Sequence, residues 1–121
     1  MPPLEMTLSG PTEVDILHYR GDSGQFRLTV TDNEDPPNPV DISGMTWDAD
    51  IRAKKNDTTL LASFEVVPVV GQTNSVDVIL TKEEARKLPK KSYYDIEMSD
   101  GTGATTLLYG ELKSEEDVSR P

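Results

Sequence analysis

The chain has 121 residues, which is enough for one domain with its own core and too few for two. Hydrophobic residues make up only 35% of it, which favours a thin core between two layers. It contains no cysteine, which excludes disulfide bonds, thiolate metal sites and cysteine nucleophiles. Its net charge of −10 would repel a phosphate backbone, so we predict that it binds no nucleic acid. We interpret that charge as an aid to solubility, with an acidic face that docks a basic partner as the alternative.

The N-terminal segment has neither a basic region nor an apolar run, and no stretch approaches the roughly 20 apolar residues of a membrane span. We therefore expect a soluble protein, made in the cytoplasm, that does not contact a membrane. Within residues 1–13, Leu4, Met6 and Leu8 alternate with polar residues. This alternation predicts an N-terminal extension or an edge strand ahead of the domain.

Short runs of alternating apolar and polar residues recur about every ten positions, a spacing typical of sandwiches and barrels. The apolar faces of these runs are Phe26, Leu28 and Val30; Trp47, Ala49 and Ile51; Ala62, Phe64 and Val66; Val76, Val78 and Leu80; Tyr94, Ile96 and Met98; and Leu108, Gly110 and Leu112. Turn residues at 71–74 and 100–103 predict two hairpins. Trp47, the only tryptophan, is expected at the centre of the core.

One short helix is predicted over residues 82–88. Thr81 is placed to cap it, and Glu84 is placed to bond back to the amide of Thr81. Leu80 is expected to pack on Ala85, and the proline that follows the segment ends the helix. We interpret this helix as a connection between two strands across one end of the sandwich.

These elements predict an all-β fold: an antiparallel β-sandwich of about 7–9 strands with one short helix. The sandwich domain is expected over residues 14–113. Residues 114–121 are charged and lack an apolar rhythm, which predicts a flexible tail. Residues 32–39 combine turn formers with prolines and predict a long, stiff loop between strands.

Candidate catalytic residues are few. His18 is the only histidine, and one imidazole cannot form a multi-histidine metal site, so we interpret it as a packed or surface side chain. Residues 32–35 offer oxygen ligands, but their spacing differs from that of a calcium loop. Carboxylates on the outward faces of strands are most simply solvated: Asp48, Asp50, Glu65, Asp77, Asp95 and Glu97. We therefore predict no catalytic, cofactor-binding or metal-binding residue and no enzymatic activity.

Seven short motifs occur in order: RGDS at 20–23, VDISG at 40–44, IR at 51–52, TKEE at 81–84, YYDI at 93–96, LLYGEL at 107–112 and EDVSR at 116–120. The triplet at 20–22 also occurs in integrin-binding loops, but the glycines around it favour a turn that starts a strand. Over about residues 18–120 the series resembles an immunoglobulin-like module of bacteriophage tail and baseplate proteins. Such modules are found at the N-terminus of baseplate upper proteins and tail-fibre attachment proteins.

The resemblance implies a non-enzymatic virion structural protein, made in the host cytoplasm and carrying no cofactor. It would be a small tail, baseplate or fibre-adaptor subunit that mediates assembly with other virion proteins and is repeated as a symmetric homo-oligomer. We expect its contacts at the chain ends and in the proline-rich loop. These residues are Leu4, Met6, Asp35, Pro36, Pro37, Pro39, Val118 and Arg120.

Two alternatives belong to other functional classes. The first is a capsid decoration protein, which would use the same kinds of contact on a different part of the particle. The second is a carbohydrate- or cell-surface-binding β-sandwich, which requires exposed aromatic rings on one sheet face. Tyr19, Tyr93 and Tyr109 are the candidates, and alternation places Tyr93 and Tyr109 opposite the apolar sets of their strands.

Overall fold

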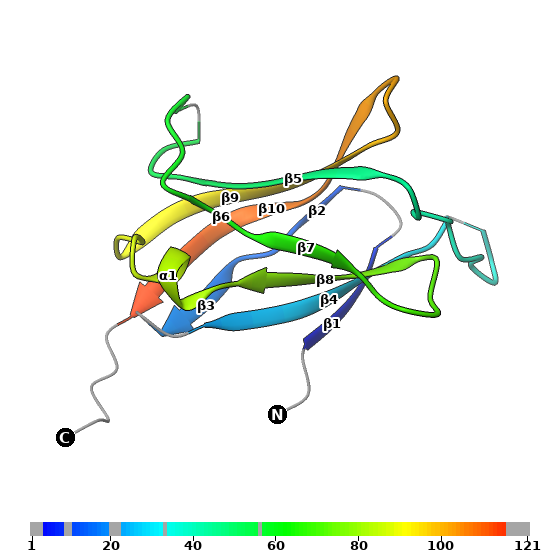
Figure 1. Cartoon of the computed structure of the whole chain (residues 1–121), viewed down its shortest axis with the longest axis horizontal. Helices are drawn as coiled ribbons and strands as arrows, with labels where there is room; N and C mark the ends of the chain where they lie inside the picture. The colour runs from blue at the N-terminus through cyan, green and yellow to red at the C-terminus, as the bar shows by residue number, and fades with distance from the viewer. Residues whose placement is uncertain (1–3, 9–10, 20–22, 33, 56, 116–121) are drawn as a thin grey trace.

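The structure, a computed structural model, describes residues 4–8, 11–19, 23–32, 34–55 and 57–115 (Figure 1). Its elements, in chain order, are β1 (Leu4–Leu8), β2 (Thr12–Glu13), β3 (Ile16–Tyr19), β4 (Gly24–Val30), β5 (Thr46–Arg52), β6 (Ala62–Ser63), β7 (Glu65–Pro68), β8 (Ser75–Leu80), α1 (Lys82–Ala85), β9 (Lys91–Ser99) and β10 (Ala104–Glu115). Within these residues, no helix is long and apolar enough to cross a membrane.

Two sheets face each other across the core, which confirms the predicted all-β sandwich (Figure 1). One sheet has the order β1-β4-β8-β7, and the other has the order β2-β10-β9-β5-β6, with β3 also paired to β10. The order β1-β4-β8-β7 matches the strand order A-B-E-D of one immunoglobulin sheet, and β10-β9-β5 matches the order G-F-C of the other. The parallel pairing of β1 with β4 departs from that antiparallel arrangement.

The sequence pattern predicts an antiparallel sandwich, but some of the strand pairs are parallel. β1 runs parallel to β4, and both β2 and β3 run parallel to β10. Alternation of apolar and polar residues shows which face of a strand is buried, but it carries no information on the direction of the neighbouring strand. Within residues 1–13, where the sequence predicts an extension or an edge strand, β1 lies at one edge of the four-stranded sheet.

Both predicted hairpins are confirmed, β7 with β8 and β9 with β10. A register shift between Thr106 and Leu108 interrupts the second hairpin. As a result, two consecutive residues, Leu107 and Leu108, are both buried. Strict alternation along this strand had assigned only Leu108 to the core.

The predicted strand over residues 62–66 is two strands, because the chain changes sheet at Phe64. β6 pairs with β5 in the six-stranded sheet, whereas β7 pairs with β8 in the four-stranded sheet. At the crossing the Phe64 amide donates to the Ala49 carbonyl at 2.9 Å. The Phe64 ring meets the rings of Phe26 and Tyr94 edge-on, with centroids 6.1 and 5.9 Å away. Phe64 therefore ties the two layers together.

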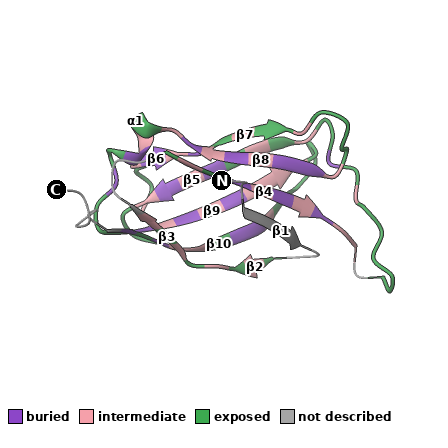
Figure 2. Cartoon of the chain, turned by 90° about the horizontal axis from the view of Figure 1, so that it is seen from below, coloured by how far each residue is buried: buried purple, intermediate pink, exposed green. Residues whose placement is uncertain are grey.

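Aliphatic side chains from both sheets fill the centre of the sandwich. Figure 2 shows buried residues, in purple, on strands of both sheets. Leu28 and Val78 come from one sheet, and Ile51, Ile96 and Leu108 come from the other; all five are fully buried. The prediction that Trp47 occupies the centre is wrong. Trp47 faces inward but is only partly buried, because it pairs with Met98 near one end of β5 and packs against the margin of the core.

The helix is one turn long, shorter than the predicted 82–88, because the amides of Lys87 and Leu88 bond three residues back. Thr81 caps it as predicted, accepting from the Glu84 amide at 3.3 Å. The prediction for the Glu84 side chain is wrong: its carboxylate pairs with Lys87 and accepts from the Ser63 amide at 3.1 Å. It therefore links the helix to β6 instead of closing the cap.

We expect Glu84→Gln to lower the free energy of unfolding by about 1 kcal/mol near neutral pH. The hydrogen bond from Lys87, helped by that from the Ser63 amide, lowers the pKa of Glu84 below its ordinary 4.5. A carboxyl group with a lowered pKa adds stability above its unfolded pKa and loses that contribution as the pH falls through its folded pKa.

Urea unfolding at about pH 7 and about pH 3 tests this, because the difference between wild type and variant should shrink at the lower pH. Glu83→Gln, at the exposed neighbouring position, is the matched control and should behave as wild type at both. If Glu84→Gln lowers the free energy of unfolding by the same amount at both pH values, the prediction is contradicted.

Candidate functional site

Two surfaces stand out, and the first is at the end of the sandwich where β4 leads into β5. There the loops at residues 32–45 and 69–74 lie beside each other (Figures 1 and 2). The Ile42 amide donates to the Thr73 carbonyl at 2.8 Å and joins them. We call this surface, made of the described residues 32, 34–45 and 69–74, the loop end.

The proline-rich loop is closed by Asp32. Its carboxylate accepts from the amides of Glu34 and Asn38, at 3.1 and 2.9 Å, and from the Asn38 side chain at 3.2 Å. These bonds, the Asn38 amide first, lower the pKa of Asp32. The Asp32 carboxylate oxygens, which were candidate calcium ligands in the sequence, thus accept the hydrogen bonds that close the loop. Among the described residues, no cluster of three or more metal-binding side chains occurs.

The loop presents the predicted contact residues to solvent: Asp35, Pro36, Pro37 and Pro39 are all exposed. Beside this loop, Val70 is 98% exposed at the tip of the β7–β8 turn. The sequence analysis missed Val70, although it directly precedes Gly71, whose φ of 84° marks the turn. A large apolar residue in a hairpin turn is the signal that could have identified it.

The second surface is a depression of about 310 Å³ on the solvent face of the six-stranded sheet. We call it the sheet-face depression. Among its lining residues are Glu13, Asp15, Arg52, Lys55, Tyr93, Asp95, Tyr109 and Glu111.

Strand register brings these residues together. Tyr93 on β9 lies between Arg52 on β5 and Glu111 on β10. Asp95, two residues further along β9, pairs with Tyr109. Because alternate residues of a strand share a face, these side chains all lie opposite the core. Tyr93 and Tyr109, two of the three aromatic rings predicted as candidates for a carbohydrate-binding face, therefore line one depression.

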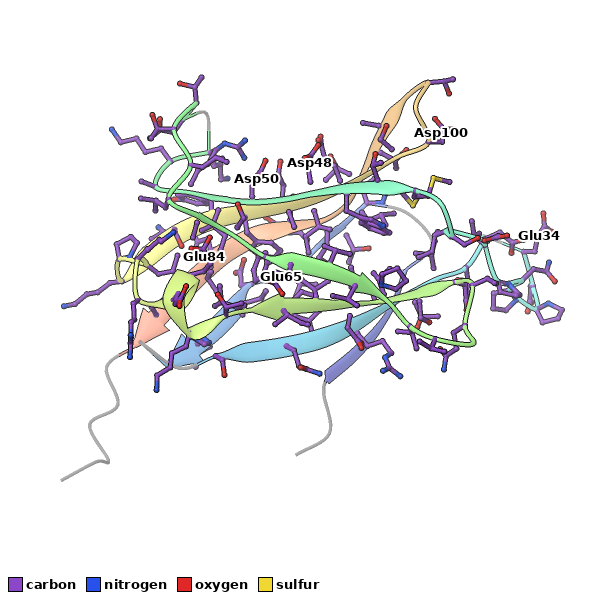
Figure 3. The ribbon with its side chains drawn as sticks, in the orientation of Figure 1. Glu34, Asp48, Asp50, Glu65, Glu84 and Asp100 are labelled. Atoms are coloured by element: carbon purple, nitrogen blue, oxygen red, sulfur yellow. The ribbon has the colours of Figure 1, made fainter. Side chains whose placement is uncertain are left out.

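Arg52 organises the acidic side of the depression. Its guanidinium nitrogens lie 3.2 Å from the Asp50 carboxylate and 3.3 Å from the Asp95 carboxylate. Burial raises the pKa of Asp95 and the nearby Asp50 and Asp48 raise it further, whereas Arg52 opposes them. Figure 3 shows Asp48 and Asp50 on the same side of β5, directed away from the core.

Two lysines lie near the Tyr93 ring. The ammonium nitrogens of Lys55 and Lys91 lie 5.6 and 5.7 Å from the ring centroid. Lys91 also pairs with Glu111 at 3.2 Å, and this hydrogen bond, with a contribution from Tyr93, raises the pKa of Lys91. Tyr109, 41% exposed, is the more accessible of the two rings.

The edge of the depression is held by the segment between β2 and β3. The Val14 amide donates to the Tyr109 carbonyl at 2.9 Å, and the Val14 carbonyl accepts from the Tyr94 hydroxyl at 2.6 Å. The Asp15 carboxylate accepts from the Glu111 amide at 3.0 Å. Burial, with the nearby Asp15, raises the pKa of Tyr94 and keeps its hydroxyl a donor. This segment runs alongside β10 and approaches it closely at Gly110, where a Cβ atom would lie 2.2 Å from the Val14 carbonyl oxygen.

The outward carboxylates divide into two groups. Asp77 forms an ion pair with Arg27 at 2.8 Å, and Asp50 and Asp95 pair with Arg52, so the interpretation that they are simply solvated is wrong for these three. Strand alternation identified their face correctly but not their ion-pair partners. The other three carboxylates agree better with the interpretation that they are solvated, since Asp48 and Glu65 are exposed and Glu97 is half-buried.

The remaining predicted residues either lie in β1 or fall outside the described part of the chain. Leu4 and Met6 lie in β1, whereas the triplet at 20–22, Val118 and Arg120 lie outside the described residues. The tail does not start at 114, because β10 extends to Glu115 alongside β3. Ser114 is buried there.

His18 lies in β3, half-buried, with its ring 3.6 Å from the point where Gly24 would carry a Cβ atom. Its Nε2 is buried and, in the described part of the chain, has no hydrogen-bond partner. This agrees with a packed side chain.

Comparison with known proteins finds no matching family model and no matching curated protein.

Proposed function

We propose that the chain is a non-enzymatic bacteriophage virion structural protein, a small tail, baseplate or fibre-adaptor subunit that joins other virion proteins. Capsid decoration is the alternative position in the particle. The observation that supports an assembly role is the loop end, where exposed prolines and Val70 sit on loops tied together by hydrogen bonds. The motif series, which resembles modules of tail and baseplate proteins, supports the virion setting.

The loop end is suited to protein contacts for two reasons. Proline has little conformational freedom to lose, and the Asp32 hydrogen bonds fix the loop further, so docking costs little ordering entropy. Val70 provides an apolar side chain that gains free energy when a partner covers it. Contacts of this size are weak singly, but symmetric repetition of the subunit in a particle multiplies them.

Sheet edges offer a second type of contact. β1 and β7 form the two edges of the four-stranded sheet. An extended segment of a partner can add to such an edge through main-chain hydrogen bonds. β7 ends at Pro68, which has no amide hydrogen to donate, so β1 is the edge we assign to strand addition.

Mass spectrometry of purified particles, with tails and heads separated, tests the proposal directly. Stoichiometric presence in the tail fraction supports a tail or baseplate subunit, and presence in the head fraction supports the decoration alternative. Absence from every particle fraction overturns the virion proposal.

We expect Val70→Asp to reduce incorporation into particles at least about fivefold, because a charge replaces the apolar contact and must be desolvated on docking. The melting temperature should not change, since the side chain is almost fully exposed. Quantitative mass spectrometry of particles assembled with the variant measures the effect.

Leu60→Asp is the matched control, because Leu60 is also exposed but lies in the β5–β6 loop at the opposite end of the sandwich (Figure 1). It should be incorporated at the wild-type level. Equal incorporation of the two variants would show that the loop end makes no essential contact.

A further inference from the structure

The sheet-face depression is not used by the proposed assembly function. We propose that it binds an uncharged saccharide, with Tyr109 as the stacking ring and the fixed carboxylates as hydrogen-bond partners for sugar hydroxyls. The observations behind this are the shared depression, its two tyrosines and the ion pairs that hold its polar groups.

Tyr109 provides the aromatic ring on which a sugar would stack. A pyranose presents a face of C–H groups that packs favourably on an aromatic ring, and tyrosine combines such a ring with a polar hydroxyl. Tyr109 is 41% exposed on a central part of the sheet face, where strand pairing fixes its backbone on both sides. Tyr93 completes the aromatic lining, and the ammonium nitrogens of Lys55 and Lys91 lie 5.6 and 5.7 Å from its ring centroid.

The carboxylates that would bind the sugar hydroxyls are already held in place by neighbouring groups. Arg52 holds the Asp95 carboxylate, Lys91 holds the Glu111 carboxylate, and the Glu111 amide holds the Asp15 carboxylate. Carboxylate oxygens accept hydrogen bonds from sugar hydroxyls, and charge-assisted bonds of this kind are stronger than neutral ones. Because the side chains are fixed before binding, little rotamer entropy is lost when a ligand arrives.

Charge and size select the ligand class. The lining includes four carboxylates and two cations, and Arg52 is already paired with Asp50 and Asp95. An acidic sugar would meet this negative field and that of a chain with a net charge of −10. The volume of about 310 Å³ is at the lower end for small-molecule sites, which suits roughly one or two sugar rings of a longer glycan.

The test uses the full chain displayed on a tetrameric carrier, so that weak binding is raised by avidity. It is applied to a glycan array of neutral hexose and N-acetylhexosamine oligosaccharides beside sialylated, uronic and phosphorylated glycans. We expect binding to at least one neutral glycan, followed by titration calorimetry with that glycan and the untethered chain. Tyr109→Ala should weaken binding at least about tenfold, whereas Tyr109→Phe, which keeps the ring, should stay within about threefold.

Lys113→Ala is the matched control, since Lys113 is exposed on the same strand and face but does not line the depression. Circular dichroism of each variant establishes that it is folded. The proposal is overturned if the wild type binds no neutral glycan, or binds only acidic glycans or only a poly-lysine probe. It is also overturned if the Tyr109→Ala variant binds the neutral glycan as well as the wild type does. These outcomes are independent of whether the chain is found in virus particles, so the two proposals fail separately.

Discussion

Gly110→Ala is expected to lower the free energy of unfolding by about 2–4 kcal/mol, from overpacking and a lost buried hydrogen bond. A Cβ atom at this position would lie 2.2 Å from the oxygen and 2.8 Å from the carbon of the Val14 carbonyl. These are backbone atoms, so no change of rotamer relieves the contact. Val14 is held by its bonds to Tyr94 and Tyr109, and moving it breaks one or both.

Equilibrium urea unfolding followed by circular dichroism measures this loss. Gly103→Ala is the matched control, because an added Cβ atom there meets nothing within 4 Å. Its unfolding free energy should stay within about 0.5 kcal/mol of wild type. If Gly110→Ala is as stable as Gly103→Ala, the close approach of the β2–β3 segment to Gly110 is wrong.

Ile96→Ala is expected to cost about 2–5 kcal/mol, the range for removing a large aliphatic side chain from a packed core. Ile96 is fully buried on β9, which pairs with β5 on one side and with β10 on the other, and it lies between Ala49 and Leu108 in the register. Truncation leaves a cavity between the two sheets that strand pairing prevents from collapsing.

Val70→Ala is the control for this variant, since the same kind of aliphatic truncation occurs at a position that is 98% exposed. It should change stability by less than about 0.5 kcal/mol. A loss of less than about 1 kcal/mol for Ile96→Ala would contradict a core centred on these aliphatic residues.

The two proposed surfaces lie toward different ends of the molecule. β5 starts at Thr46, beside the loop end, and finishes at Arg52, which lines the sheet-face depression. A subunit anchored in a particle through its loop end therefore keeps the depression accessible. The two proposals are compatible in one protein, although neither requires the other.

Local sequence patterns predicted most of the strands and both hairpins. Alternation in segments such as 26–31 and 46–52 determined which side chains face the core, because successive residues of a strand point to opposite faces. The same rule placed Tyr93 and Tyr109 outside the core. Thr81 predicted the start of the helix, because capping depends on an amide three residues away.

Contacts between segments distant in sequence decided the rest. The sheet change at Phe64, the burial of both Leu107 and Leu108, and the pairing of Glu84 with the Ser63 amide all depend on which strands become neighbours. Periodicity within a segment does not encode that choice. The sheet-face depression likewise exists only because register aligns β5, β9 and β10, which brings residues more than 40 positions apart onto one surface.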